Sequence, residues 1–283
     1  LEVAGADGVV EGVAPDRERA LAVTGAVRAA AALAGVNVAV SIREAIDWPR
    51  IEAALGAWRE CGPLAIVEGR DGAGPVVVDG RLRDESDVAQ LGAALSALLP
   101  DRDVAVRATP LNPPVCRALA LVEALPADGL ALRYTDGESG APVDGEIFPL
   151  GGRPVIDVLA PEALDGVLHV FVVGDDGEAA SLTPNALIPA ARLSALGSVR
   201  DGVRRVRVAW PADEAEPQRP ALAIATPGVN MVAAVVAPEP LYGPRLPLEN
   251  LEEFAPALEA GLAEARAAGA PLAAVARLLR TPA

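Results

Sequence analysis

The fold of the second half of the chain is decided by residues 152–187, GRPVIDVLAPEALDGVLHVFVVGDDGEAASLTPNAL. This stretch contains the longest strongly apolar run of the sequence, residues 167–173, and an Asp-Gly turn follows at residues 174–178. A run of β-forming residues followed by such a turn is typical of a β-hairpin. Because both faces of residues 167–173 are apolar, we expect a central strand that is covered on both sides.

The composition excludes several classes of function. The chain has 283 residues, of which 52% are apolar, and a net charge of −15. Nucleic acid and anionic membranes both require a basic patch, so we expect neither as a partner. No long uncharged apolar run occurs, and we therefore expect no transmembrane helix. The start, LEVAGADGVV, is neither a signal peptide nor an initiator Met, which predicts a piece of a longer chain.

The N-terminal part of the chain contains an internal repeat without gaps. Residues 9–12 (VVEG) align with residues 77–80 (VVDG), and the alignment continues through Val38 over Val106. Each copy predicts a strand, a helix that begins after an acidic N-cap, and a second strand. A further helix and strand, at about residues 49–67, recur near residues 112–137, so the full unit is predicted as helix–strand–strand–helix–strand.

Two local patterns of this unit point to a known family. Residues 9–13 follow the pattern V-x-G-x-V before a helix, and residues 35–40 (GVNVAV) form the strand after it. In this respect the unit resembles the BON domain of bacterial envelope proteins. The resemblance covers about residues 6–110 and implies two BON-like αβ domains, at residues 1–46 and 47–111, with a role in envelope attachment or phospholipid contact. The second copy departs from the pattern at Arg81 and Leu82.

From Gly137 onward, helical periodicity gives way to short apolar runs separated by Gly and Pro. Such spacing favours a β-sandwich, and the fold class of the whole chain is therefore predicted as α+β. Two closing helices are expected, one after Asn250 and a last one at residues 271–280. The expected strands are residues 154–159, 167–173, 179–182, 203–210, 221–225 and 229–237.

The second half also resembles a known domain. Residues 165–185 (DGVLHVFVVGDDGEAASLTPN) and 227–241 (PGVNMVAAVVAPEPL) are similar to the sandwich domain of unknown function that ends many bacterial serine/threonine kinases and caspase-like proteins. Residues 113–116 (PPVC) match the helix that often leads into that domain. The resemblance implies that residues 112–283 form an extracytoplasmic, non-catalytic module.

Few side chains are candidates for a site. Cys61 and Cys116 are the only cysteines, and they either form a structural disulfide in an oxidising compartment or remain two buried thiols. The family resemblance favours the disulfide. His169 is the only histidine, and its place in the middle of a strand favours a core residue over a catalytic base. One His and two Cys make no metal-binding pattern.

A basic segment is the remaining candidate. Arg204, Arg205 and Arg207 form either a face that binds an anionic ligand or acidic partner, or a solvated strand face. Residues 175–178 (DDGE) lack the alternating oxygen ligands of a calcium loop, so we interpret them as a turn. We therefore expect no catalytic, cofactor or metal site.

The sequence thus predicts a non-catalytic sensor or protein-interaction region of a bacterial envelope signalling protein of the serine/threonine kinase type. Its expected location is the periplasm, or elsewhere outside the cytoplasm, of a GC-rich Gram-negative bacterium, and its partner is a protein or a small envelope ligand. The alternative is a structural component of an envelope or secretion assembly, which would oligomerise through its αβ repeats. An enzyme is the third possibility.

Overall fold

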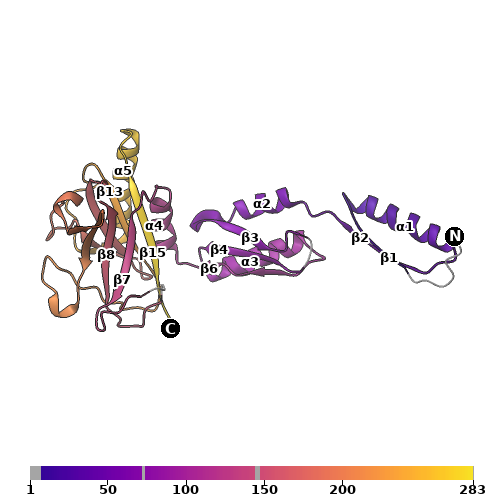
Figure 1. Ribbon diagram of the computed structural model, residues 1–283, viewed down its shortest axis with the longest axis horizontal. Coiled ribbons are helices and arrows are strands. Elements are labelled where there is room, and N and C mark those ends of the chain that lie inside the picture. The colour runs from indigo at the N-terminus through magenta and orange to yellow at the C-terminus, as the bar shows by residue number, and fades with distance from the viewer. Residues whose placement is uncertain (1–7, 72–73, 144–146, 283) are drawn as a thin grey trace.

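The structure, a computed structural model, describes residues 8–71, 74–143 and 147–282. Residues 1–7, at the start of the predicted first domain, lie outside this description. The elements form three parts that lie in a row along an extended molecule, with the N-terminal part at one end and a large β-sandwich at the other (Figure 1). Both helices and several sheets are present, which confirms the α+β class.

The first unit consists of strand β1 (Gly8–Ala14), helix α1 (Arg17–Leu33) and strand β2 (Val38–Glu44). The two strands are parallel and paired along their whole length. Helix α1 begins after Asp16, whose side chain accepts a hydrogen bond from the backbone N–H of Arg19, as the acidic N-cap predicts. Gly35, at a φ of 65°, reverses the chain after the helix.

The middle unit has two helices on one face of a small sheet. Strand β4 lies between antiparallel β3 and parallel β5, and β6 continues the parallel pairing. Apolar residues of both helices and of the central strands form one core. The elements are α2 (Trp48–Gly56), the 3₁₀ helix η1 (Arg59–Cys61), β3 (Leu64–Glu68), β4 (Val76–Leu82), α3 (Glu85–Leu98), β5 (Val104–Val106) and β6 (Thr109–Pro110).

The third part is a sandwich of two sheets with helices on one side. A five-stranded sheet has the order β14-β10-β9-β13-β15, and a four-stranded sheet has the order β11-β12-β8-β7. One apolar core lies between the sheets, and a second lies between the five-stranded sheet and helices α4 and α5. The elements are α4 (Pro113–Glu123), β7 (Ala131–Asp136), β8 (Pro154–Pro161), β9 (Val167–Val173), β10 (Glu178–Thr183), the 3₁₀ helices η2 (Leu193–Ala195) and η3 (Ala212–Glu214), β11 (Ser198–Arg200), β12 (Val203–Ala209), β13 (Gly228–Ala237), β14 (Leu248–Asn250), α5 (Leu251–Ala267) and β15 (Ala273–Thr281).

Strand β9 confirms the prediction made from the apolar run. It is buried along its whole length at the centre of the five-stranded sheet, and it forms the expected antiparallel hairpin with β10. Phe171 and Val173 enter the core beneath the helices, whereas Leu168, Val170 and Val172 enter the core between the sheets. The strand therefore connects the two cores.

Two predicted elements are wrong. Residues 271–280 form most of strand β15 instead of a second closing helix, and β15 pairs with β13 along its whole length at the edge of the sheet. The Ala- and Leu-rich segment favours a helix locally, but pairing with β13 satisfies its backbone and buries Leu278 and Leu279. Residues 221–225, expected to be a strand, belong to no strand.

Candidate functional site

A disulfide joins the middle unit to the sandwich. Cys61 lies at the end of η1 and Cys116 lies in α4, and their Cα atoms are 4.7 Å apart. Both residues are almost completely buried. Helix α4 begins after Asn112, whose side-chain oxygen accepts from the backbone N–H of Val115 at 2.7 Å. Cys61 packs with Cys116 in the core between the five-stranded sheet and helices α4 and α5, whereas Leu55 and Leu64, on either side of Cys61 in the chain, belong to the core of the middle unit. The bridge therefore joins the middle unit to the sandwich.

Polar contacts reinforce the same junction. Arg81 of β4 forms an ion pair with Glu123 of α4, and the backbone N–H of Leu111 donates to the carbonyl of Leu82 at 2.7 Å. The disulfide and the ion pair therefore hold the middle unit against the sandwich, and the backbone hydrogen bond extends the pairing of β4 and β6 within the middle unit toward the start of α4.

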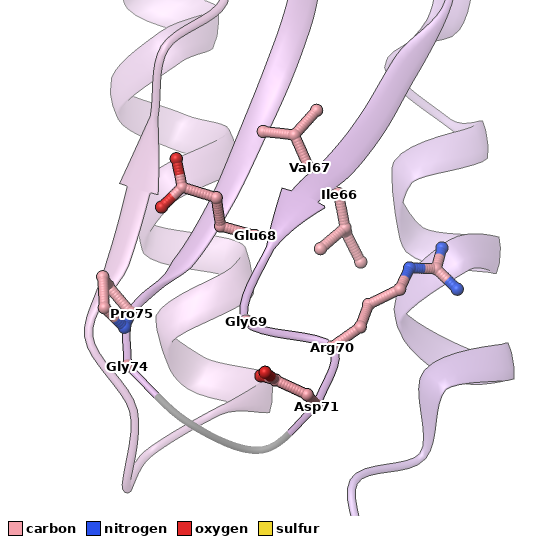
Figure 2. A pocket seen from close by; sticks show the side chains of 8 residues that line it. All are labelled: Ile66, Val67, Glu68, Gly69, Arg70, Asp71, Gly74 and Pro75. Atoms are coloured by element: carbon pink, nitrogen blue, oxygen red, sulfur yellow. The ribbon is translucent and has the colours of Figure 1, made fainter.

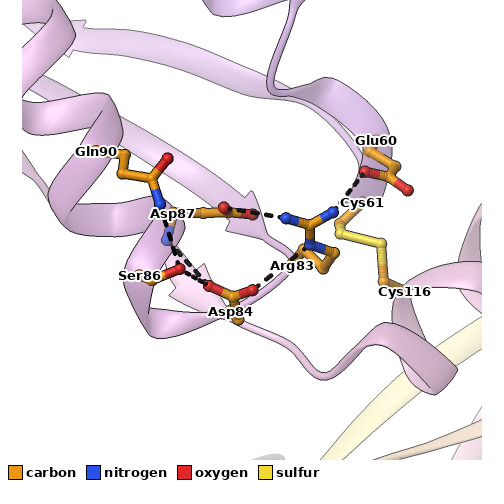
Figure 3. A network of polar contacts seen from close by, with 8 residues as sticks. All are labelled: Glu60, Cys61, Arg83, Asp84, Ser86, Asp87, Gln90 and Cys116. Carbon is orange, nitrogen blue, oxygen red and sulfur yellow. Dashed lines mark hydrogen bonds and ion pairs between the residues drawn. A yellow bond between two sulfur atoms is a disulfide. The ribbon is translucent and has the colours of Figure 1, made fainter.

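A charged network lies beside the disulfide (Figure 3). The Arg83 guanidinium lies 3.8 Å from a carboxylate oxygen of Glu60, 3.5 Å from Asp84 and 3.4 Å from Asp87. The Asp87 carboxylate is the main cause that raises the pKa of Arg83. Asp84 caps α3, and hydrogen bonds from the Ser86 hydroxyl and the Asp87 backbone N–H lower its pKa. Arg83 contacts Glu60 of η1 and also Asp84 and Asp87 at the start of α3, so the network joins these two elements.

Of the three arginines in the predicted basic segment, only Arg205 and Arg207 lie on the same face of β12. Arg205 and Arg207 of β12 both contact Asp157 of β8, with nitrogen–oxygen distances of 2.5 and 3.2 Å. Asp157 is fully buried, whereas the Arg205 side chain is 45% exposed and that of Arg207 is 29% exposed. The hydrogen bond to Asp157 raises the pKa of Arg205. Arg204 alternates to the other side of the strand and donates to the carbonyl of Leu196 at 3.0 Å.

Further residues extend this surface. Strand β7 pairs with β8 on the edge away from β12, and its Arg133 lies in register with Asp157. The guanidinium carbons of Arg207 and Arg219 lie 5.4 and 4.9 Å from the ring centre of Trp210, within the range of cation–π contacts. We refer to Arg133, Arg205, Arg207, Arg219 and Trp210, together with buried Asp157, as the arginine face.

Sequence reasoning missed Asp157 and Arg133. The available signal was a single acidic residue inside the apolar run at residues 154–160. A lone carboxylate in such a strand predicts a charged partner on an adjacent strand, but only the register shows which one. Arg207 of β12 and Arg133 of β7 are the two direct cross-strand partners of Asp157.

We predict that Asp157→Asn lowers the free energy of unfolding by about 2 kcal/mol, the usual contribution of charge-assisted hydrogen bonds. Both arginines remain partly exposed, so water compensates for some of the lost attraction. Urea unfolding measures the change. Asp201→Asn is the matched control, because its pair with Arg200 is almost fully exposed and contributes less than about 1 kcal/mol. Equal losses in the two variants would contradict the assignment of Asp157 as the buried anchor.

His169 is a core residue, as expected from its position. It is fully buried on β9, and its Nε2 atom accepts a hydrogen bond from the backbone N–H of Leu241 at 3.2 Å. Its ring centre lies 4.9 Å from that of Tyr242. Burial lowers the pKa of His169 to about 4, so the imidazole is neutral at pH 7. The imidazole is therefore enclosed by the core and has no surface exposed to solvent.

The hairpin between β3 and β4 encloses an open cavity of about 490 Å³ (Figure 2). Figure 2 shows Glu68 and Arg70 pointing to opposite sides of the loop. Glu68 pairs with Arg107 at 3.0 Å, and Arg70 pairs with Glu52 of α2. These charged groups are therefore engaged outside the cavity and do not converge on a ligand position within it.

A larger cavity of about 810 Å³ lies between the first and middle units. Val13, Trp48 and Leu98 contribute apolar surface, and acidic and basic side chains both occur on its rim. The guanidinium carbon of Arg70 lies 5.8 Å from the ring centre of Trp48. The described lining contains no His, Cys, Ser or Thr, so it supplies neither a nucleophile of these types nor an imidazole base.

Within residues 8–71, 74–143 and 147–282, no cluster of three or more His, Cys, Asp or Glu side chains is arranged to hold a metal ion. Across the same ranges, no helix combines the length and apolar character needed to cross a bilayer.

Comparisons with protein-family models, with curated proteins and with solved structures found no match to this chain. The resemblances to the BON domain and to the kinase-associated sandwich therefore remain predictions from sequence.

Proposed function

We propose that this chain is a non-catalytic, extracytoplasmic sensor or protein-interaction region of a bacterial envelope signalling protein of the serine/threonine kinase type. The observation that carries the proposal is the buried Cys61–Cys116 disulfide between the middle unit and the sandwich. Disulfides of this structural kind persist in oxidising compartments and are rare in the cytosol. By holding two parts in one arrangement, the bridge suits a region that presents binding surfaces.

The repeat spacing supports the BON-like part of the proposal. Strands β1 and β4 begin at Gly8 and Val76, and helices α1 and α3 begin at Arg17 and Glu85. The strand and the helix are thus displaced by the same distance along the sequence. In our proposal these are two copies of one αβ unit, in residues 1–46 and 47–111.

The arginine face supports a protein-interaction role. It brings together three arginines on neighbouring strands of one sheet, Arg133, Arg205 and Arg207, and the residues Trp210 and Arg219 of the connection that follows β12, in a chain whose net charge is −15. Arg and Trp are enriched among the residues that contribute most to protein interfaces. The partner that fits this surface is acidic.

An envelope or secretion assembly is the second candidate. The observation that favours it is the exposure of large apolar side chains in the first unit, including Val9, Val13 and Leu33. Exposed apolar surface of this kind marks contacts with other proteins.

Two measurements test the proposal. The first is the intact mass of the protein recovered from its native compartment, after thiol alkylation with and without reductant. We expect no alkylation of Cys61 or Cys116 unless reductant is added. Two thiols that alkylate on unfolding alone would place the chain in a reducing compartment and overturn the extracytoplasmic proposal.

The second measurement is binding of a fluorescent poly-glutamate peptide to the oxidised protein. We expect binding that weakens with added salt and that Arg219→Glu reduces, because this change reverses a charge on the arginine face. Arg266→Glu, at the exposed end of α5, is the matched control. If both variants bind as the wild type does, the arginine face is not the binding surface.

A further inference from the structure

Apolar residues lie beside the arginine face on the same outer surface of the four-stranded sheet. Cross-strand partners project to the same side of a sheet, and side chains alternate between the two sides along each strand. The register of β7, β8 and β12 therefore places further residues on the side of Asp157. We refer to these residues as the apolar patch: Ala131, Leu159, Pro161 and Val203.

The apolar patch is accessible to a partner. Val203 is 43% exposed, Ala131 is also exposed, and the other two residues are half-buried. The opposite side of the same strands is different, because it forms the core between the two sheets. An accessible apolar patch bordered by charged residues is typical of a surface that binds another protein.

Strand β12 carries the apolar and the basic surface in one line. Val203, Arg205 and Arg207 are alternate residues, so their side chains follow one another along the outer side of the strand at steps of about 6.6 Å. An extended peptide has the same repeat on each of its own sides. A segment lying along β12 in that conformation can therefore place an apolar side chain on Val203 and acidic side chains on the two arginines.

The arginines retain hydrogen-bond donors for such a segment. Arg205 and Arg207 each donate to Asp157 through one nitrogen, whereas a guanidinium has five N–H donors. Within the described part of the chain, Arg133 and Arg219 take part in no ion pair. Four arginines and one buried carboxylate leave the arginine face with three unbalanced positive charges.

We propose that the arginine face and the apolar patch together bind an extended acidic segment of a partner protein, in which one apolar and two acidic residues occupy alternate positions. The inference rests on the protein-interaction role proposed above and names the sequence pattern that this surface selects. The carboxylates pair with the guanidinium groups, and the apolar side chain loses contact with water on the apolar patch.

Charge favours a peptide over an anionic membrane. The positive charge is confined to one face of a chain whose net charge is −15. A peptide segment contacts that face alone. A bilayer of anionic lipids extends beyond the face and repels the acidic remainder of the chain.

The test compares two fluorescent peptides of equal charge on the oxidised full chain. The first, Glu-Thr-Glu-Thr-Leu-Thr-Glu-Thr-Glu, contains the pattern in both chain directions, and the second has Thr in place of the central Leu. We expect the wild type to bind the leucine peptide about tenfold more tightly, because the leucine side chain is then partly buried.

Two valines of the same hairpin provide the variant and its control. Val203→Ser should abolish the preference for the leucine peptide and leave the affinity for the threonine peptide unchanged. Val199→Ser should keep the preference. Val199 is 39% exposed, but it is the cross-strand partner of Arg204 and lies on the other side of the sheet. Equal urea midpoints of the two variants show that neither change acts through the fold.

Three results overturn the inference and leave the acidic partner proposed above in place: equal binding of both peptides by the wild type, a preference that survives Val203→Ser, or a preference that Val199→Ser also abolishes. If neither peptide binds, the interaction role of the arginine face fails as well. Binding of phosphatidylglycerol vesicles in that case would assign the surface to a membrane. The alkylation of Cys61 and Cys116 is independent of all these results, so it tests the extracytoplasmic proposal separately.

Discussion

Cys61→Ser is expected to lower the free energy of unfolding by about 4 kcal/mol, the largest effect that we predict for a single substitution. The sequence separation of the two cysteines is 55, and in the chain-entropy model a cross-link over that distance removes about this much conformational freedom from the unfolded state. Urea unfolding of the oxidised protein, compared with the variant, measures the difference.

The position of the bridge determines where the variant should loosen. Because it joins η1 to α4, hydrogen exchange in the variant should increase most at these two elements. Cys116→Ser and the double variant are matched controls, and both should lose as much stability as Cys61→Ser. Reductant should destabilise the wild type to the same level and leave the double variant unchanged. A wild type with reductant-insensitive stability would show that the bridge contributes nothing.

Acidification should destabilise the protein through His169, by about 3 kcal/mol in total. Burial lowers the pKa of this imidazole to about 4 in the folded chain, whereas the unfolded value is about 6.5. The unfolded chain therefore binds the proton more readily. The stabilising contribution is fully present above pH 6.5 and is lost progressively as the pH falls through this window toward 4.

One substitution isolates this titration, because His169 is the only histidine of the chain. Its Nδ1 atom has no hydrogen-bond partner among the described residues, so nothing there would stabilise the charged ring. His169→Phe keeps an aromatic ring beside Tyr242 but removes the titration. Urea midpoints measured between pH 7 and pH 4.5 should fall more steeply for the wild type than for the variant. Parallel curves would show that His169 titrates normally.

Local rules predicted the helix starts well. Asp16, Asp84 and Asn250 all accept a hydrogen bond from a backbone N–H in the first turn of the following helix. These contacts join residues two or three positions apart, so they depend little on the rest of the fold. The burial of strand β9 on both faces was predicted equally well, because it follows from the apolar run at residues 167–173.

Residues 271–280 show where local rules end. Their alanines and leucines favour a helix, yet the segment is strand β15 because the edge of β13 offers a complete ladder. The candidate site shows the same limit. The three arginines at residues 204–207 were visible in the sequence, but the strand alternation separates Arg204 from the other two.

The sequence by itself determined the helix caps, the central apolar strand, the α+β class and the acidic character of the chain, since each depends on neighbouring residues or on composition. Only the tertiary structure decided that Cys61 meets Cys116, that Asp157 lies between arginines, and that the last segment pairs with β13. These contacts join residues tens of positions apart, and their partners are selected by strand register and by packing of the whole core.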